Sequence, residues 1–230
     1  MTPRKKDASA PIPPSPPEVP EDLSAAPDLA DLRSTALRGV AVDEVDLSGV
    51  DAASLELEES RLDGVELSGA RLKGASIRDA VVEAGSWANV DAKEATLTRV
   101  AFQGVRLTGA GFSTTTIRDV SFTGCRLDLA SFRFGKLERV RFDDCRLEDI
   151  DLYETRLESV VFVGCALTKA DLSKASFTRC EMRDCELDAI ASPDRLRGVA
   201  MPWPDIVRSA AVLAQAVGVR VLDEDGPSPA

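Results

Sequence analysis

The chain has 230 residues, of which 44% are apolar and 29% are charged, a composition typical of a soluble globular protein. It contains no histidine, which excludes Ser-His-Asp and Cys-His catalytic centres as well as histidine-containing metal sites. Its formal net charge of −11 disfavours direct binding of nucleic acid, because phosphate contacts need a basic surface. No apolar run reaches the roughly 18 residues that a membrane-spanning helix requires, so we expect no contact with a membrane.

Residues 1–22 are predicted to form a disordered, proline-rich tail, because seven of the 13 prolines lie between Pro3 and Pro20. A proline-rich ligand for some recognition module is the alternative. Arg4, Lys5 and Lys6 are followed by polar residues and prolines rather than by an apolar segment, which is not the pattern of a signal peptide. We therefore expect a cytoplasmic protein whose cysteines are free thiols.

Residues 23–36 are expected to form an N-terminal cap, helical or irregular, with Leu23, Leu29 and Leu32 arranged around Pro27. Such a cap is needed if the following segment is a solenoid, because open solenoid ends expose unpaired strand edges. Residues 223–230 are expected to form a second short disordered tail at the other end of the chain.

From Leu37 to Leu187 every fifth residue is apolar, thirty-one times without a slip in register. Two residues before each of these central positions lies a second column of small or apolar residues, such as Ala70, Ala75 and Cys125. A straight helix or strand would scatter these columns over several faces, because a period of five matches neither structure. A strand that bends once per repeat keeps both columns inside, and it winds into stacked coils that pair as parallel strands.

Similar residues recur every 20 positions, which sets the size of one coil. Cysteine does so at positions 125, 145, 165 and 185, and phenylalanine at positions 102, 122, 142 and 162. Because like residues stack on like in solenoids, four pentapeptides make one turn. The thirty-one pentapeptides therefore predict about eight coils over residues 37–190, with no lumen because the inward side chains fill each coil.

The segment Ala170-Asp171-Leu172-Ser173-Lys174 matches the A(D/N)LXX consensus of the pentapeptide-repeat family, and Ser121-Phe122 and Ser131-Phe132 resemble its phenylalanine-centred variants. The resemblance covers about residues 37–190. It implies an all-β fold, a right-handed quadrilateral parallel β-helix. The best-understood members are quinolone-resistance proteins whose acidic rods mimic DNA and bind DNA gyrase, so the resemblance offers gyrase as a partner.

Trp87 is large for a central position, but Gly85 and Ala92 are small neighbours that can compensate its volume. We expect compensated packing or a shallow bulge here, with a functional indole as the alternative.

The cysteine column is expected to fill space as small apolar residues, with a metal or redox role as the alternative. No Cys-x-x-Cys motif is present.

Catalysis is not expected, because the many outward carboxylates lie on a convex rod that offers no cleft to shift their pKa values. The sequence also lacks the glycine-rich phosphate-binding motifs, so we expect no catalytic, metal-binding or cofactor-binding residue and no cofactor.

The column Arg106, Arg126 and Arg146, flanked by Asp128 and Glu148, is interpreted as a surface lattice of ion pairs, with an anion-binding stripe as the alternative.

Residues 191–222 are expected to form a C-terminal cap with a short α-helix at about residues 204–217. Pro204 and Asp205 suit the start of this helix and Gly218 its end, and Val219, Val221 and Leu222 could add a short strand. The helix would either close the last coil or pair with a second copy in a homodimer, as in the gyrase-binding relatives. Its candidate face comprises Trp203, Ile206, Val207, Ala210, Leu213, Ala214 and Val217.

Three large apolar residues occupy outward positions of the predicted coils. Phe134 and Tyr153 fall on adjacent turns of one face and Leu129 at the neighbouring corner, beside Arg133. This composition resembles an interface centre, although isolated exposed apolar residues are common. The sequence therefore predicts a non-enzymatic interaction or scaffold protein with an unknown protein partner, and a DNA-mimicking modulator of gyrase is the alternative.

Overall fold

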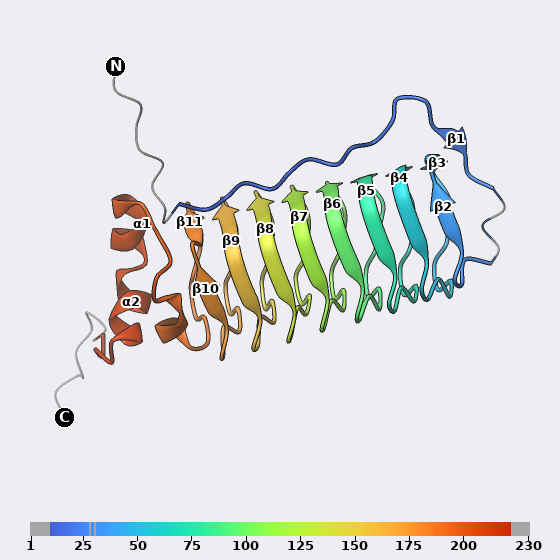
Figure 1. Cartoon of the computed structure of the whole chain (residues 1–230). Coiled ribbons are helices and arrows are strands. Elements are labelled where there is room, and N and C mark those ends of the chain that lie inside the picture. Colours follow the sequence, from blue (N-terminus) through green and yellow to red (C-terminus); the bar gives the residue numbers. More distant parts are fainter. Residues whose placement is uncertain (1–9, 28, 30, 222–230) are drawn as a thin grey trace, which may run out of the picture.

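The computed structural model describes residues 10–27, 29 and 31–221, which form a parallel β-solenoid of about eight turns closed by a short helical segment (Figure 1). The strands are β1 (Ser24–Ala25), β2 (Ala36–Arg38), β3 (Val40–Asp43), β4 (Glu56–Asp63), β5 (Ser76–Glu83), β6 (Thr96–Gln103), β7 (Thr116–Thr123), β8 (Lys136–Asp143), β9 (Arg156–Val163), β10 (Ser176–Thr178) and β11 (Glu181–Arg183). The helices are η1 (Pro193–Leu196), α1 (Trp203–Arg208) and α2 (Ala210–Ala216). None of the described helices is long and apolar enough to cross a membrane.

Strand register confirms the predicted size of the coil. Phe102 pairs with Phe122, and Phe122 with Phe142, in parallel ladders that run from β4 to β9. Each eight-residue strand covers two sides of its coil, whereas the other two sides pair through single bridges such as Asp46 with Glu66. The whole core is thus one stack of equivalent turns.

The chain bends at the second residue after each central position. At these corners φ is positive, for example 50° at Asp79, 55° at Asp119 and 59° at Phe134. This left-handed conformation turns the strand around a corner of the coil and brings the next pair of inward residues back toward the axis. It costs most side chains about 1 kcal/mol relative to glycine, so the packed interior must stabilise the corners.

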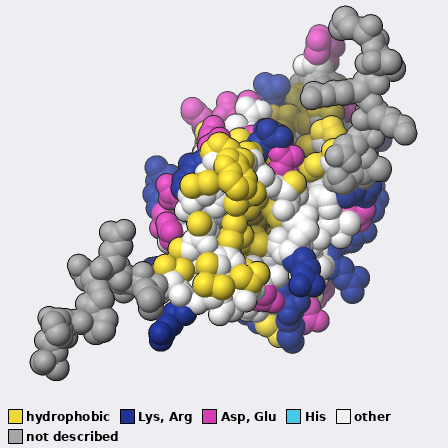
Figure 2. Space-filling view, turned by 90° about the vertical axis from the view of Figure 1, so that its left-hand side faces the viewer, with side chains coloured by type: hydrophobic (Ala, Val, Ile, Leu, Met, Phe, Trp, Pro, Cys, Tyr) yellow, Lys and Arg dark blue, Asp and Glu magenta, His cyan; other side chains and the backbone are white. Residues whose placement is uncertain are grey.

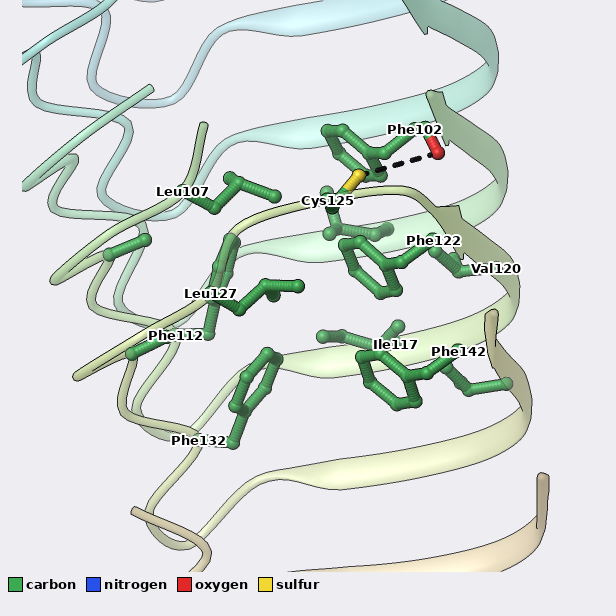
Figure 3. Close-up of a cluster of buried hydrophobic side chains, with 14 of the residues drawn as sticks. Phe102, Leu107, Phe112, Ile117, Val120, Phe122, Cys125, Leu127, Phe132 and Phe142 are labelled. Atoms are coloured by element: carbon green, nitrogen blue, oxygen red, sulfur yellow. Dashed lines mark hydrogen bonds between the residues drawn. The ribbon is translucent and has the colours of Figure 1, made fainter. Parts of the chain in front are cut away.

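Inside the coils, aromatic side chains form continuous stacks (Figure 3). The rings of Phe102, Phe122, Phe142 and Phe162 follow one another with centroids 4.9 Å apart and planes within 6°. On another side of the coils, Phe112 and Phe132 stack at 5.0 Å. The central column is buried throughout residues 37–187 except at Leu47 and Phe177, which are only partly buried near the two ends.

The inward cysteines pack as expected, and they also donate weak hydrogen bonds. Cys145 Sγ lies 3.4 Å from the carbonyl oxygen of Phe122 in the preceding coil, and four other cysteines make the equivalent contact. The Thr155 hydroxyl uses the same position to donate to the Phe132 carbonyl at 2.8 Å. All five thiols are buried and free, and burial raises the pKa of the Cys180 thiol.

Near Trp87 the backbones of two neighbouring coils approach closely at Gly85. Trp87 is 2% exposed and its ring meets Phe102 edge-on at 5.5 Å. Gly85 has φ of 72°, and a Cβ atom there would lie 2.8 Å from the Val65 backbone nitrogen and still closer to the Val65 carbonyl oxygen. Glycine therefore lets the backbone approach the preceding coil where the indole fills the core. The Trp87 indole nitrogen is buried and has no hydrogen-bond partner among the described residues.

The N-terminal segment differs from its prediction as a free tail. Residues 1–9 lie outside the described residues, but residues 10–20, here called the N-terminal strap, run along the solenoid from the C-terminal cap toward β1 (Figure 1). The Ser15 backbone N–H donates to Asp119 at 3.0 Å, and the Glu18 N–H donates to Asp79 at 3.1 Å. Proline-rich composition favours extended chain, as expected, but these acceptors hold the chain against the fold.

The two caps differ in their details from the sequence expectation. The described residues of the N-terminal cap contain no helix; β1 pairs with β3, Ala36 begins β2, and Leu32 inserts into the core with 2% exposure. At the other end the predicted helix is divided at Ser209 into α1 and α2. The suggested strand after it is absent from residues 219–221, and Leu222 lies outside the described residues.

Candidate interaction surface

The outward aromatic residues singled out in the sequence come together. The Phe134 and Tyr153 rings meet edge-on with centroids 5.6 Å apart. The Arg133 guanidinium lies 4.5 Å from the Tyr153 centroid and 5.6 Å from that of Phe134, while also pairing with Asp151 at 2.9 Å. These contacts join the exposed Phe134 ring to the partly buried Tyr153 ring.

Leu129 lies at the neighbouring corner and is 62% exposed, compared with 51% for Phe134. Both residues adopt left-handed backbone, with φ of 61° and 59°. Large side chains disfavour this conformation, and burial does not repay the cost here because both side chains face solvent. We call Leu129, Arg133, Phe134 and Tyr153 the corner patch.

At the C-terminal end, the predicted apolar helix face is divided between two environments. Ile206, Leu213 and Ala214 of that face are partly buried, whereas the buried apolar residue of α2 is Val212, which was not among the predicted ones. The inward side of α1 is instead polar. Its Asp205 carboxylate is 3% exposed, accepts the Asp184 backbone N–H at 2.9 Å and pairs with Arg208. Asp205 therefore fastens the helix to the last corner of the solenoid.

The other residues of the predicted face are exposed. Trp203 is 74% exposed, Val207 58% and Val217 77%, and Ala210 is also exposed. We call Trp203, Val207 and Val217 the end face. Figure 2, which views this end of the molecule, shows apolar side chains gathered into a stripe. The helices thus cover part of the last coil and leave an apolar outer side.

Charged side chains of opposite sign form ion pairs between and within neighbouring coils. Arg146 lies 3.6 Å from Asp128 and 3.2 Å from Glu148, and Glu138 pairs with both Arg118 and Lys136 at 3.1 Å. The predicted ion-pair lattice is therefore present around Arg146. Arg106 and Arg126, stacked in the same column, form no ion pair with any residue that the structure describes.

Sequence reasoning missed the column of corner residues beneath the strap. This corner ladder contains Asp79, Arg99, Asp119, Arg139, Ser159 and Arg179 on successive coils. Arg139 binds Asp119 through two hydrogen bonds of 2.7 Å, and Arg99 binds Asp79 in the same way. The Arg139 guanidinium holds the pKa of the Asp119 carboxyl below its usual range, and the Ser15 N–H acts in the same direction.

The signal for this ladder was present in the sequence. Aspartate and arginine alternate from one coil to the next between Asp79 and Arg139, at the corner position of one side of the coil. Only the fold shows that the strap passes over that column. Among the described residues, no group of three or more cysteine, aspartate or glutamate side chains is arranged to hold a metal ion.

Among solved structures, the chain resembles HetL, a pentapeptide repeat protein of the cyanobacterium Nostoc involved in regulating heterocyst differentiation. The two are 17% identical with a TM-score of 0.42, over 72% of this chain and 91% of HetL. QnrB1, a plasmid-mediated fluoroquinolone resistance protein, is 16% identical with a TM-score of 0.38, over 82% of this chain and 100% of QnrB1. A search against curated protein sequences gave no match.

Family models give the decisive comparison. A model of the pentapeptide repeat region matches residues 95–172, and a model of eight pentapeptide repeat copies matches residues 42–79. Both segments lie within the stacked coils, where each described strand pairs in register with the strand of the next coil. The chain therefore belongs to the pentapeptide-repeat family.

Proposed function

We propose that this protein is a non-enzymatic scaffold that binds a protein partner through the corner patch. The observation that carries the proposal is the placement of Leu129, Phe134 and Tyr153 at outward positions, where the fold needs no apolar side chain. Aromatic residues and arginine are enriched at the centres of protein interfaces. Burying one such ring against a partner contributes about 1.5–3 kcal/mol by removing apolar area from water.

The local rigidity of the patch supports the same role. Arg133 is held by Asp151 and contacts both rings, so little side-chain entropy would be lost on binding. The left-handed backbone at Leu129 and Phe134 adds a cost that glycine or asparagine would avoid. A contact with a partner would account for keeping large side chains at these corners.

The double variant Phe134→Ser, Tyr153→Ser tests the proposal. Lys93→Ser, Glu94→Ser is the control, since Glu94 lies in the same corner column as Phe134 and Lys93 in the same column as Tyr153, on an earlier coil. We expect affinity capture from extracts of the native host to recover a partner with the parent and the control, but not with the patch variant. All three proteins should melt within a few degrees of one another.

Two outcomes would contradict the proposal. Unchanged capture by the patch variant would remove the patch from the interface. A large loss of stability in that variant alone would mean that the rings support the fold rather than a contact.

A homodimer through the C-terminal helix stays a prediction. The exposed end face, Trp203, Val207 and Val217, supports it, because a second copy could cover these apolar side chains. Sedimentation of the parent and of Val207→Ser would separate a dimer from a monomer.

Gyrase binding also stays a prediction. A DNA mimic needs a continuous negative stripe, whereas carboxylates around Arg146 and along the corner ladder are paired with arginines. The interleaved charge therefore gives gyrase no specific support over other partners. Titration of the folded protein into a supercoiling assay would measure this activity directly.

A further inference from the structure

We infer that the corner ladder is a binding site for polyproline-II peptides of x-Pro-Pro sequence, and that the N-terminal strap is its intramolecular ligand. The ladder and the corner patch are different surfaces, so the inference does not rest on the proposed function. It rests on the two strap hydrogen bonds, on the spacing of coils and strap, and on two unpartnered polar atoms further along the ladder, among the residues that the structure describes.

The strap and the solenoid have matching repeats. Ser15 and Glu18 are three residues apart, and their acceptors Asp119 and Asp79 are two coils apart. Three residues of polyproline II rise roughly 9.3 Å. Two coils at the usual strand spacing rise roughly 9.6 Å. One turn of a polyproline-II helix thus spans two coils. Residues three apart in the peptide face the same side, so each such residue meets one aspartate of the ladder.

The strap sequence fits this spacing. Backbone N–H groups face the ladder from Ser15 and Glu18, and the two residues between them, Pro16 and Pro17, have none. The preceding triplet, which starts at Ile12, has the same x-Pro-Pro form. Prolines at the intervening positions hold the peptide extended and leave no unpaired donor against the protein surface.

The ladder supplies acceptors at the same two-coil interval. Asp79 and Asp119 are 5% and 7% exposed, and each carboxylate is held by the arginine of the next coil. A fixed carboxylate forms a charge-assisted bond with a peptide N–H, stronger than a bond between neutral groups. Arg99 lies between the two acceptors and has no atom that can accept a hydrogen bond from a peptide N–H. Only every second coil therefore offers an acceptor, which selects peptides with an N–H group at every third residue.

Ser159 occupies the next acceptor position, beside the strap triplet at Ile12. Pro11 and Pro13 line a shallow groove with Val161 of the same coil. The Ser159 hydroxyl and the Arg179 Nε are both buried and lack a hydrogen-bond partner among the described residues. Arg179 pairs with Glu158 through a terminal nitrogen, which leaves its Nε free for a second carboxylate. In Ser159→Asp the new carboxylate would face Arg179 as Asp119 faces Arg139, and it would accept the Ile12 N–H.

Amide hydrogen exchange in the full chain tests the inference. We expect the Ser15 and Glu18 amides to exchange at least tenfold more slowly than in a free peptide of residues 10–21, and the Ile12 amide close to the peptide rate. Ser159→Asp should slow the Ile12 amide by about tenfold, the effect of one added hydrogen bond to a charged group. Ser113→Asp, which adds the same charge on another side of the solenoid, should leave it unchanged.

Binding in trans provides a second measurement. The full-length variant Ser15→Pro, Glu18→Pro keeps an extended strap but loses both donors, so it should bind a fluorescent peptide of residues 10–21. In the parent the strap already occupies the corner ladder, so the parent should bind this peptide at least tenfold more weakly. A peptide with proline at both positions should not bind. Unprotected Ser15 and Glu18 amides, or equal behaviour of the two peptides, would overturn the inference.

Discussion

The inward positions of the coils accept only apolar or small side chains, whereas the corners of the same coils accept glycine, aspartate, arginine, leucine and phenylalanine at one backbone angle. The difference follows from what each position touches. In the phenylalanine column, the Phe142 ring meets identical rings 4.9 Å away in the coils on both sides, so a substitution there disturbs two neighbours. Corner side chains contact solvent or the strap. Core packing therefore does not restrict their residue type, and they can provide binding contacts.

The largest effect should come from placing a charge in an inward stack. Phe142→Asp puts a carboxylate between the rings of Phe122 and Phe162 with no partner, and should cost about 5 kcal/mol or more. Arg146→Glu changes an exposed side chain on the same coil and should cost about 1 kcal/mol or less. Thermal melting of both variants measures this contrast. Equal losses would contradict the assignment of inward and outward positions.

An intermediate effect is expected where the backbone itself enters the interior. In Gly85→Ala the new methyl group would collide with the Val65 backbone and strain the left-handed conformation, costing about 3 kcal/mol. Gly104→Ala is the matched control, because it shares the positive φ but has no atom within 4 Å of the added carbon, and should cost about 1 kcal/mol. Chemical denaturation gives both values. Similar losses at the two sites would show that the close approach to Val65 has no energetic role.

The smallest of the three effects concerns a corner. Asp119→Asn should cost about 1–2 kcal/mol near neutral pH, because Arg139 and the Ser15 N–H lose a charged acceptor. The folded-state pKa of Asp119 is lowered, so its stabilisation is complete above the unfolded pKa of about 3.9 and is lost as pH falls through the folded value. The stability difference between parent and variant should therefore shrink below about pH 4. A difference that stays constant with pH would rule out the charged form as its source.

Much of the fold could be predicted because one physical rule is repeated many times. The spacing of the central residues, the recurrence of cysteine and phenylalanine once per coil from Cys125 and Phe102, and the small residues beside them all require the same coil. The corner patch could be predicted for a related reason. Once the register is known, Phe134 and Tyr153 can only face outward on adjacent turns, and the structure brings their rings to 5.6 Å.

The parts that could not be predicted depend on contacts between segments that do not repeat. Burial in the C-terminal cap was assigned from helical periodicity, but Asp205 turns inward because the last corner presents the backbone N–H of Asp184 as a donor. The apolar residues Trp203 and Val217 then remain outside. Periodicity shows that a helix has an apolar side and does not show which surface that side meets.

The N-terminal strap separates most clearly what each level of structure decides. The sequence alone determines that residues 10–20 are extended, since proline fixes φ and removes backbone donors. It also determines the two apolar columns and hence the coil. Only the tertiary structure decides that the strap lies on the corner ladder, because its acceptors Asp79 and Asp119 are 61 and 104 residues away from their donors in sequence. A local pattern specifies backbone shape, whereas pairing between distant segments depends on the spacing that the folded coils create.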